Sequence, residues 1–201
     1  MHKTLKVILI INLVFSLTQG CKNKNHNENN NPAELTFKVN QSLLGEKYVD
    51  KYLGFSFLPP KSCLQMSEAM VQKVKDQLKK EYTITNSYVI EPHQFFLNKN
   101  DRFACLISIL TTVSNVDSTI SKYQQAIFAY SKNSQVTQAI FLHNGFRIYQ
   151  SLIISKDIIH FKLVVPQSSN KSFQIDYVIP KTIYQDELEA IESSIGSLLK
   201  L

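Results

Sequence analysis

The sequence predicts an α+β domain, mainly an antiparallel β-sheet with flanking helices, that follows a signal peptide and a flexible tether. Three observations support this prediction. Strand-like segments are separated by short turns, and neighbouring strands joined in this way must be antiparallel. Three segments with apolar residues at helical spacing are interspersed among the strands, so the helices are expected to pack on the sheet. The N-terminal residues have a different composition from the rest of the chain.

The chain begins with the features of an export signal. His2, Lys3 and Lys6 form a short positive region, and an apolar run at residues 7–17 follows it. The run has the length of a secretory apolar region, about 7 to 15 residues, and is shorter than the roughly 20 residues that span a bilayer. We therefore expect residues 1–20 to be a signal peptide.

The end of this segment resembles the lipobox of bacterial lipoproteins. Leu17, Thr18, Gln19 and Gly20 precede Cys21, and Gly20 offers the small side chain that a signal peptidase needs beside the scissile bond. The resemblance implies that Cys21 is lipidated with chains such as palmitate. Two or three acyl chains, at about 0.8 kcal/mol per buried methylene, would anchor the protein firmly. The alternative is ordinary secretion with an unmodified cysteine.

Residues 21–46 are predicted to form a flexible Asn/Lys-rich tether. The tract is poor in apolar side chains until about Ala33, so it buries too little surface to offset the entropy of ordering. Lys22 follows Cys21, where an aspartate would hold an enteric lipoprotein at the inner membrane. The resemblance therefore implies the outer membrane or its periplasmic face in the cell envelope.

Residues 47–201 are predicted to form a single globular domain. Asn144-Gly145 tolerates positive φ and is the strongest hairpin signal of the chain. The strand at 102–111 is apolar on both faces and should be central. The capping-box spacing of Ser62 and Gln65 predicts a helix start at Ser62. The expected elements are a short strand at 34–39, a strand in "YLGFSFLPP", a helix at 62–80, strands at 88–97 and 102–111, a helix from Asp117 or Ser118, strands at 136–143, 146–154, 157–165 and 172–179, and a C-terminal helix with Leu188, Ile191, Ile195, Leu198 and Leu199 on its apolar stripe.

The order of these elements resembles the PsbP-like fold. The similarity is carried by the strand "YLGFSFLPP" followed at once by a helix, by the later antiparallel strands, and by the closing helix with "IESSIGSLL". It covers about residues 48–201. Members of this family mostly act as non-catalytic assembly, stabilising or binding factors, so the resemblance implies such a role and no catalytic residue.

Composition and motifs argue against several functional classes. The net charge of +6 is spread along the chain and forms no basic cluster interleaved with aromatics, so no nucleic-acid partner is expected. His93, His143 and His160 lie on different predicted strands without an i, i+4 pair, so no metal site is expected. No nucleophile elbow or glycine-rich phosphate loop is present in the sequence, and we expect no cofactor.

Cys63 and Cys105 are the two cysteines of the predicted domain. They are a possible disulfide in an oxidising compartment, or two buried thiols in separate places. The sequence does not decide between these arrangements, because the Cα separation that permits a bridge is set by the fold.

A candidate binding surface lies on the polar positions of three strands. If Ser155-Lys156 is a two-residue hairpin loop, Tyr149 lies opposite Lys162, and the next turn could bring Lys162 opposite Asp176. The surface is either the solvated face of the sheet with a cross-strand ion pair, or a binding patch for a peptide, glycan or acidic ligand. Its residues are Arg147, Tyr149, His160, Lys162, Gln174 and Asp176.

These features predict a lipid-anchored cell-envelope protein with a non-catalytic binding or assembly role. Its partners would be the membrane, through the N-terminal lipid, and an envelope protein or glycan. Two alternatives stay open at this point. One is an envelope hydrolase whose nucleophile and base come from separate loops and leave no linear motif, and the other is an immunity or inhibitor lipoprotein.

Overall fold

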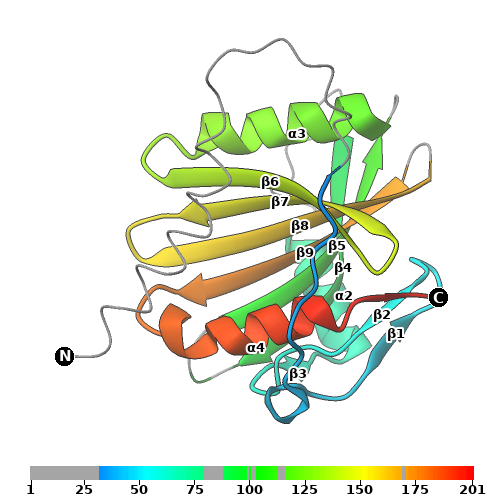
Figure 1. Cartoon of the computed structure of the whole chain (residues 1–201), viewed down its shortest axis with the longest axis vertical. Coiled ribbons are helices and arrows are strands. Elements are labelled where there is room, and N and C mark those ends of the chain that lie inside the picture. Colours follow the sequence, from blue (N-terminus) through cyan, green and yellow to red (C-terminus); the bar gives the residue numbers. More distant parts are fainter. Residues whose placement is uncertain (1–31, 79–87, 99, 101–102, 113–115, 169–170) are drawn as a thin grey trace. The chain divides into compact units, whose positions relative to one another are not determined.

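A seven-stranded antiparallel sheet forms the centre of the molecule (Figure 1). The structure is a computed structural model and describes residues 32–78, 88–98, 100, 103–112, 116–168 and 171–201. The strand order is β3-β4-β5-β9-β8-β7-β6. Its strands are β3 (Leu64–Gln65), β4 (Tyr88–Asn98), β5 (Phe103–Thr112), β6 (Gln135–His143), β7 (Phe146–Ile154), β8 (Ile158–Ser168) and β9 (Lys171–Pro180).

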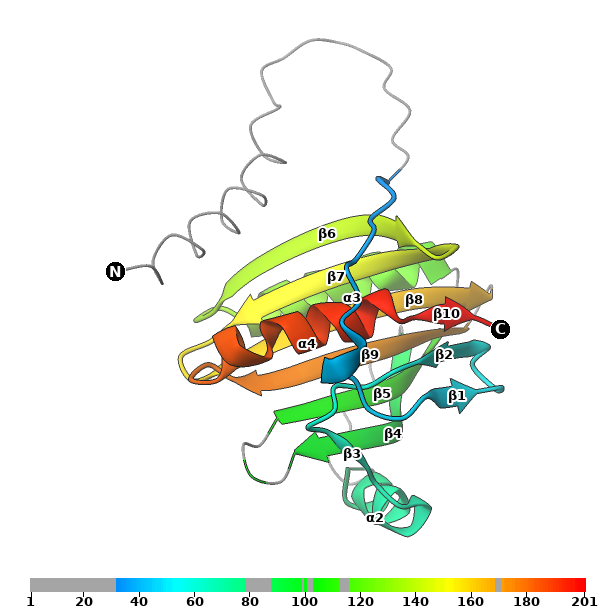
Figure 2. The ribbon, with the colours of Figure 1, turned by 60° about the horizontal axis from the view of Figure 1, so that its bottom comes forward.

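Helices cover both faces of this sheet (Figure 2). On one face, α4 (Tyr184–Gly196) packs Ile191 and Ile195 into the larger apolar core. On the other face, α3 (Val116–Tyr130) packs Ile120, Tyr123 and Ile127 against the strands. Alternate residues of a strand point to opposite faces, so β5, β7 and β8 each contribute apolar side chains to both cores. The α+β fold class, with a mainly antiparallel sheet and flanking helices, is confirmed.

Smaller elements surround the sheet. A three-stranded antiparallel sheet in the order β1-β2-β10 adds Phe55 and Phe57 to the larger core. The described residues contain no helix with the length and hydropathy of a membrane span. The remaining elements are η1 (Gln41–Leu43), β1 (Tyr48–Asp50), β2 (Phe55–Phe57), α2 (Glu68–Leu78) and β10 (Leu199–Lys200).

Two local signals are confirmed. Asn144 and Gly145 both have positive φ, 48° and 75°, in the tight turn between β6 and β7. This conformation suits a two-residue hairpin loop, because its twist matches that of the flanking strands. The strand β5 lies between β4 and β9 with both faces buried, as its continuous apolar run predicts.

The predicted start of the first helix is wrong. Residues 64–65 pair with β4 at Leu97 and Phe96, and the Met66 amide donates to the Phe95 carbonyl at 2.9 Å. The helix α2 therefore begins at Glu68, because the sheet edge uses the backbone that the capping box would have placed in a helical turn. At the other end of the chain, Leu199 belongs to β10 and not to the C-terminal helix.

The domain begins earlier than predicted. The compact unit runs from Pro32 to Leu201, so residues 32–46 belong to it and not to the tether. Phe37 packs against the larger core, and the Asn40 amide donates to Ser193 Oγ at 3.0 Å. Residues 21–46 are polar on average, so the prediction missed the few apolar side chains among them that pack against α4. The expected strand at 34–39 is reduced to a single bridge between Glu34 and Leu142. The predicted signal peptide and Cys21 lie outside the described residues.

The contact between residues 37–39 and α4 can be tested at Gly196. A Cβ atom added there would lie 2.6 Å from Phe37 Cβ and 2.9 Å from Val39 Cγ2. We expect Gly196→Ala to lower the free energy of unfolding by about 1–3 kcal/mol, measured by urea denaturation. Without that contact, alanine would be neutral or stabilising because of its helix propensity.

A double-mutant cycle supplies the control. Phe37→Gly removes the Cβ atom that lies nearest, so Gly196→Ala should cost less in the Phe37→Gly background than in the wild type. Equal costs in both backgrounds would contradict the packing of residues 32–46 on α4.

Candidate binding pocket under helix α3

The sheet face under α3 carries the six residues of the predicted binding surface. Arg147 is exposed, and His160 and Lys162 are half-buried. Tyr149 and Asp176 are only 8% and 4% exposed, and Gln174 is also buried. The expectation of one open, solvated face is therefore wrong. It failed because the apolar stripe of α3 must be buried, and the sequence does not say which face of the sheet it covers.

The strand register differs from the predicted one by two residues. Tyr149 pairs with Val164, and Lys162 pairs with Ser151. The turn between β7 and β8 lies one residue further along the chain than predicted, because the Ser155 amide donates to the Ile158 carbonyl at 3.0 Å across Lys156 and Asp157. The shift is even, so Tyr149 and Lys162 still share a face. The expected pairing of Lys162 with Asp176 is confirmed.

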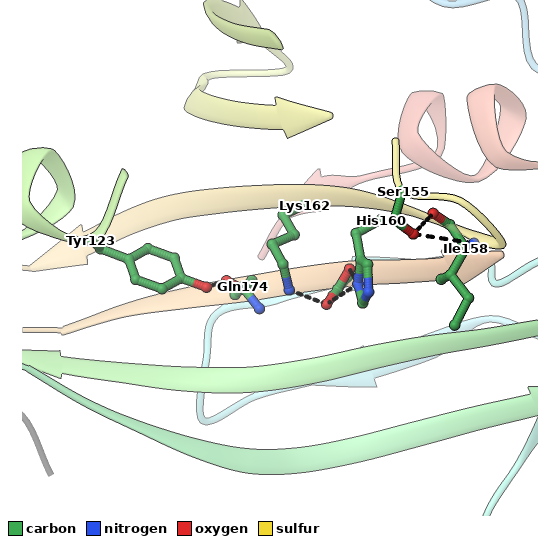
Figure 3. Close-up of polar contacts among 7 residues, drawn as sticks. Tyr123, Ser155, Ile158, His160, Lys162 and Gln174 are labelled. Carbon is green, nitrogen blue, oxygen red and sulfur yellow. Dashed lines mark hydrogen bonds and ion pairs between the residues drawn. The ribbon is translucent and has the colours of Figure 1, made fainter. Parts of the chain in front are cut away.

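A buried ionic cluster lies at the centre of this face (Figure 3). Lys162 Nζ donates to Asp176 Oδ2, and His160 Nδ1 lies 3.3 Å from each carboxylate oxygen. Burial raises the pKa of the Asp176 carboxyl, but the charge of Lys162 and the hydrogen bonds of His160 and Lys162 outweigh it and hold the pKa below its ordinary value. Because an ionised carboxylate only accepts hydrogen bonds, Nδ1 of His160 carries the proton.

A second polar contact fixes α3 to the sheet. The Tyr123 hydroxyl donates to Gln174 Oε1, one position along β9 on the same face as Asp176. Burial and the nearby charge of Asp176 raise the pKa of Tyr123 well above its ordinary value, so its hydroxyl stays protonated. The contact orients the Tyr123 ring, which packs edge-on against Tyr88 with ring centroids 5.2 Å apart.

A pocket of about 370 Å³ opens beside this cluster, between the C-terminal half of α3 and the strands β7 and β8. Its walls combine aromatic faces, aliphatic side chains and hydroxyl groups, and His160 and Lys162 bring the ionic cluster to its lining. At the mouth, the Tyr130 side chain is 83% exposed. The lining residues are Tyr88, Tyr123, Ala126, Ile127, Tyr130, Ser131, Ser134, Ile153, Ser155, Ile158, His160 and Lys162.

The lining determines which interactions the pocket can make. Flat tyrosine faces offer stacking surface, and hydroxyl groups both donate and accept hydrogen bonds. Lys162 is already paired with Asp176, so the charge of the lysine is balanced. The lining therefore suits contacts made through shape and hydrogen bonding rather than through charge.

The serine hydroxyls of the pocket do not form a catalytic arrangement with His160. Ser155 Oγ donates to the carbonyl of Ile158 within its own turn. Among the described residues, neither Ser131 nor Ser134 forms a hydrogen bond with the imidazole of His160, whose Nδ1 is bonded to Asp176. An activated nucleophile would need that contact.

Most pocket residues were not predicted from the sequence. Tyr123 and Tyr130 are seven residues apart on α3, so they lie on nearly the same side of the helix, and this spacing was the available signal. Tyr88 and Ile158 come from different strands, and only the packing of α3 brings them near these tyrosines. Arg147 is outside the pocket, with its guanidinium carbon 5.5 Å from the centroid of the Tyr149 ring.

The other two histidines have structural partners. His93 lies at a register irregularity of β4, between Pro92 and Gln94. Its Nε2 lies 2.7 Å from Asp50 Oδ2. His143 bonds through its ring nitrogens to the carbonyls of Leu35 and Gly196. Among the described residues, no group of three or more potential ligands is placed to hold a metal ion.

Cys63 and Cys105 are free, buried thiols, which is one of the two arrangements that the sequence left open. Cys63 directly precedes β3 and Cys105 lies on β5, with β4 between these two strands in the sheet. The Cys63 thiol lies 3.9 Å from the carbonyl oxygen of Phe103. Burial raises the pKa of the Cys63 thiol to about 12, which keeps it protonated.

Comparison with known proteins finds no matching family model and no matching curated protein. The chain is similar to the solution structure of cyanobacterial PsbP (CyanoP) from Synechocystis sp. PCC 6803, with 10% identity, a TM-score of 0.49, and coverage of 78% of this chain and 92% of that chain. It is also similar to a crystal structure from Bacteroides thetaiotaomicron VPI-5482, with 11% identity, a TM-score of 0.39, and coverage of 79% of this chain and 49% of that chain. These values describe a resemblance in fold and say nothing about function.

The ionic cluster generates a stability prediction. Asp176→Asn leaves Lys162 without its counter-charge, and we expect it to lower the free energy of unfolding at pH 7 by about 3 kcal/mol. The folded-state pKa of Asp176 is depressed, so its contribution is fully present above the ordinary carboxyl pKa and is lost as the pH falls through the folded value. The difference between wild type and variant, measured by urea denaturation, should shrink below about pH 4. A difference that stays constant down to pH 2 would contradict this account.

Proposed function

We propose that the protein is a lipid-anchored cell-envelope protein whose domain binds a saccharide of the envelope in the pocket under α3, without catalysing a reaction. The observation that carries this proposal is the pocket lining. Three tyrosines and three serines surround a space of about 370 Å³ beside a charge-balanced cluster. A space of this size accommodates a small ligand.

A saccharide fits this lining better than an acidic ligand or an apolar one. Sugar rings present apolar C–H faces that stack on tyrosine rings, and their hydroxyls match the serine hydroxyls, the Lys162 protons and the free Nε2 of His160. A strongly acidic ligand would need an uncompensated cation, whereas the charge of Lys162 is balanced by Asp176. A purely apolar ligand would displace water from the polar groups of the lining without offering them hydrogen bonds.

The same geometry favours binding over hydrolysis. In the described part of the chain, the hydroxyl of Ser155 is engaged in its own turn and the imidazole of His160 is held by Asp176. General-base activation would require the hydroxyl and the imidazole to face each other within hydrogen-bond reach. The arrangement orients a ligand instead of activating an attacking group.

The N-terminal sequence supports the lipid anchor. A positive region and an apolar run precede Gly20-Cys21, and polar residues separate Cys21 from the start of the domain at Pro32. A tract of that composition is suited to a linker that keeps a folded domain clear of a membrane surface. Acylation at Cys21 would hold the domain in the envelope, where its ligand is.

Substitution of a rim tyrosine tests the pocket. Tyr130→Ala should weaken binding of sugar fragments released from the purified cell wall by about fivefold, because one stacking surface is lost. The measurement is ligand-detected NMR titration. Phe128→Ala is the matched control, since Phe128 is a 59% exposed aromatic on the same helix that does not line the pocket. Equal binding by wild type, Tyr130→Ala and Phe128→Ala would contradict the proposed site.

Substitution of the acylated cysteine tests the anchor. We expect the wild-type chain to incorporate an alkyne-labelled palmitate and to sediment with membranes, and Cys21→Ser to lose the label. Cys63→Ser is the control, because that thiol is buried and should carry no acyl chain. Mass spectrometry of the processed N-terminus that finds an unmodified Cys21 would contradict lipidation.

A further inference from the structure

The strand β6 is an exposed sheet edge without the usual protection. It forms one edge of the seven-stranded sheet and pairs with β7 over nine residues without a register shift. Its sequence "QVTQAIFLH" contains no proline, lysine, arginine or acidic residue. Natural edge strands are commonly shortened, bulged or charged, because a regular open edge invites pairing with another strand.

The opposite side of the sheet illustrates such protection. The strand β3 has only two residues, and α2 packs beside β4 with an ion pair between Lys75 and Glu91. The sheet therefore offers one long regular edge, β6.

The unpaired backbone groups of β6 can be assigned from its end. The Leu142 amide donates to the Ala33 carbonyl at 2.9 Å, and the Leu35 amide donates to the Leu142 carbonyl at 2.8 Å. Leu142 therefore points its backbone groups away from β7. By the alternation of an antiparallel ladder, Ile140, Gln138 and Val136 do the same. Among the described residues, no other segment forms backbone hydrogen bonds with these three.

We propose that β6 pairs in antiparallel fashion with β6 of a second copy of this chain, with the two-fold axis at Gln138. In this register Gln138 lies opposite itself and Val136 lies opposite the partner's Ile140. The two central sheets then form one continuous sheet, and the outward backbone groups of the central residues are paired across the axis.

The charge and the exposure of β6 favour a second copy of this chain as the partner that pairs with this strand. A strand placed opposite itself brings identical residues close together, so any charge near the axis would repel its own copy. Residues 135–142 carry no charge, and apolar Val136 meets apolar Ile140. Gln138, Ala139 and Ile140 are exposed in the single copy, and Ile140 retains 43% of its surface. Pairing would cover this segment, while residues 33–35 occupy only the end at Leu142.

Charge substitution at the axis tests this pairing directly. Sedimentation equilibrium of the full-length wild-type chain should show dimers. Gln138→Lys and Gln138→Glu, each alone, should weaken association by about fivefold or more, because two like charges then face each other. An equimolar mixture of the two variants should recover association as a heterodimer, since opposite charges now meet at the axis.

Two further variants complete the experiment. Lys73→Glu changes the charge of an exposed residue on α2 and should leave association unchanged. Ile140→Pro removes one outward amide without touching the ladder with β7, and should also weaken association. A wild type that stays monomeric, single Gln138 variants that associate as the wild type does, or a mixture that fails to recover association would each overturn the proposal.

Discussion

The coverage of one sheet on both faces is the constraint on which the rest of this structure depends. The strands β7 and β8 carry apolar side chains toward α4 on one face and toward α3 on the other, whereas β9 carries Gln174 and Asp176 on the α3 side. Polar residues at alternating positions on the α3 side cannot all reach water. Asp176 lies at the middle of β9 on that side and is ionised through its contacts with Lys162 and His160. The ion cluster is therefore a consequence of coverage, because a buried charge needs both a counter-charge and hydrogen bonds.

The pocket results from the incomplete coverage of the same face. The helix α3 ends at Tyr130, while β7 and β8 continue to the turn at 155–158. Between the C-terminal half of α3 and these strands, aromatic and hydroxyl side chains surround a space that no side chain fills. The ion cluster at its lining is held by β8 and β9, which pair without a register shift from Ile158 to Pro166. A polar site on paired strands keeps its geometry better than one on a loop, which suits recognition by hydrogen bonds.

The N-terminal part of the domain connects the sheet edge to α4. Residues 33–35 pair with the end of β6, Phe37 contacts the larger core, and Asn40 bonds to Ser193. His143 joins the same region by hydrogen bonds to the carbonyls of Leu35 and Gly196. The segment thus closes one end of the β6 edge and leaves the middle of that strand open.

The sequence by itself determined the features that local chemistry decides. Alternation of apolar residues located the main strands, the Asn144-Gly145 pair located the hairpin turn through its tolerance of positive φ, and the apolar run in β5 predicted its central position. It also placed the six polar residues of β7, β8 and β9 on one face, because that depends only on the period of a strand and on an even register shift. Only the tertiary structure decided what covers that face. Whether Tyr149 and Asp176 are open to a ligand, and whether Tyr88 and Tyr130 lie near His160, depends on where α3 packs. That choice rests on the summed burial of many side chains distant in sequence, and no local pattern encodes it.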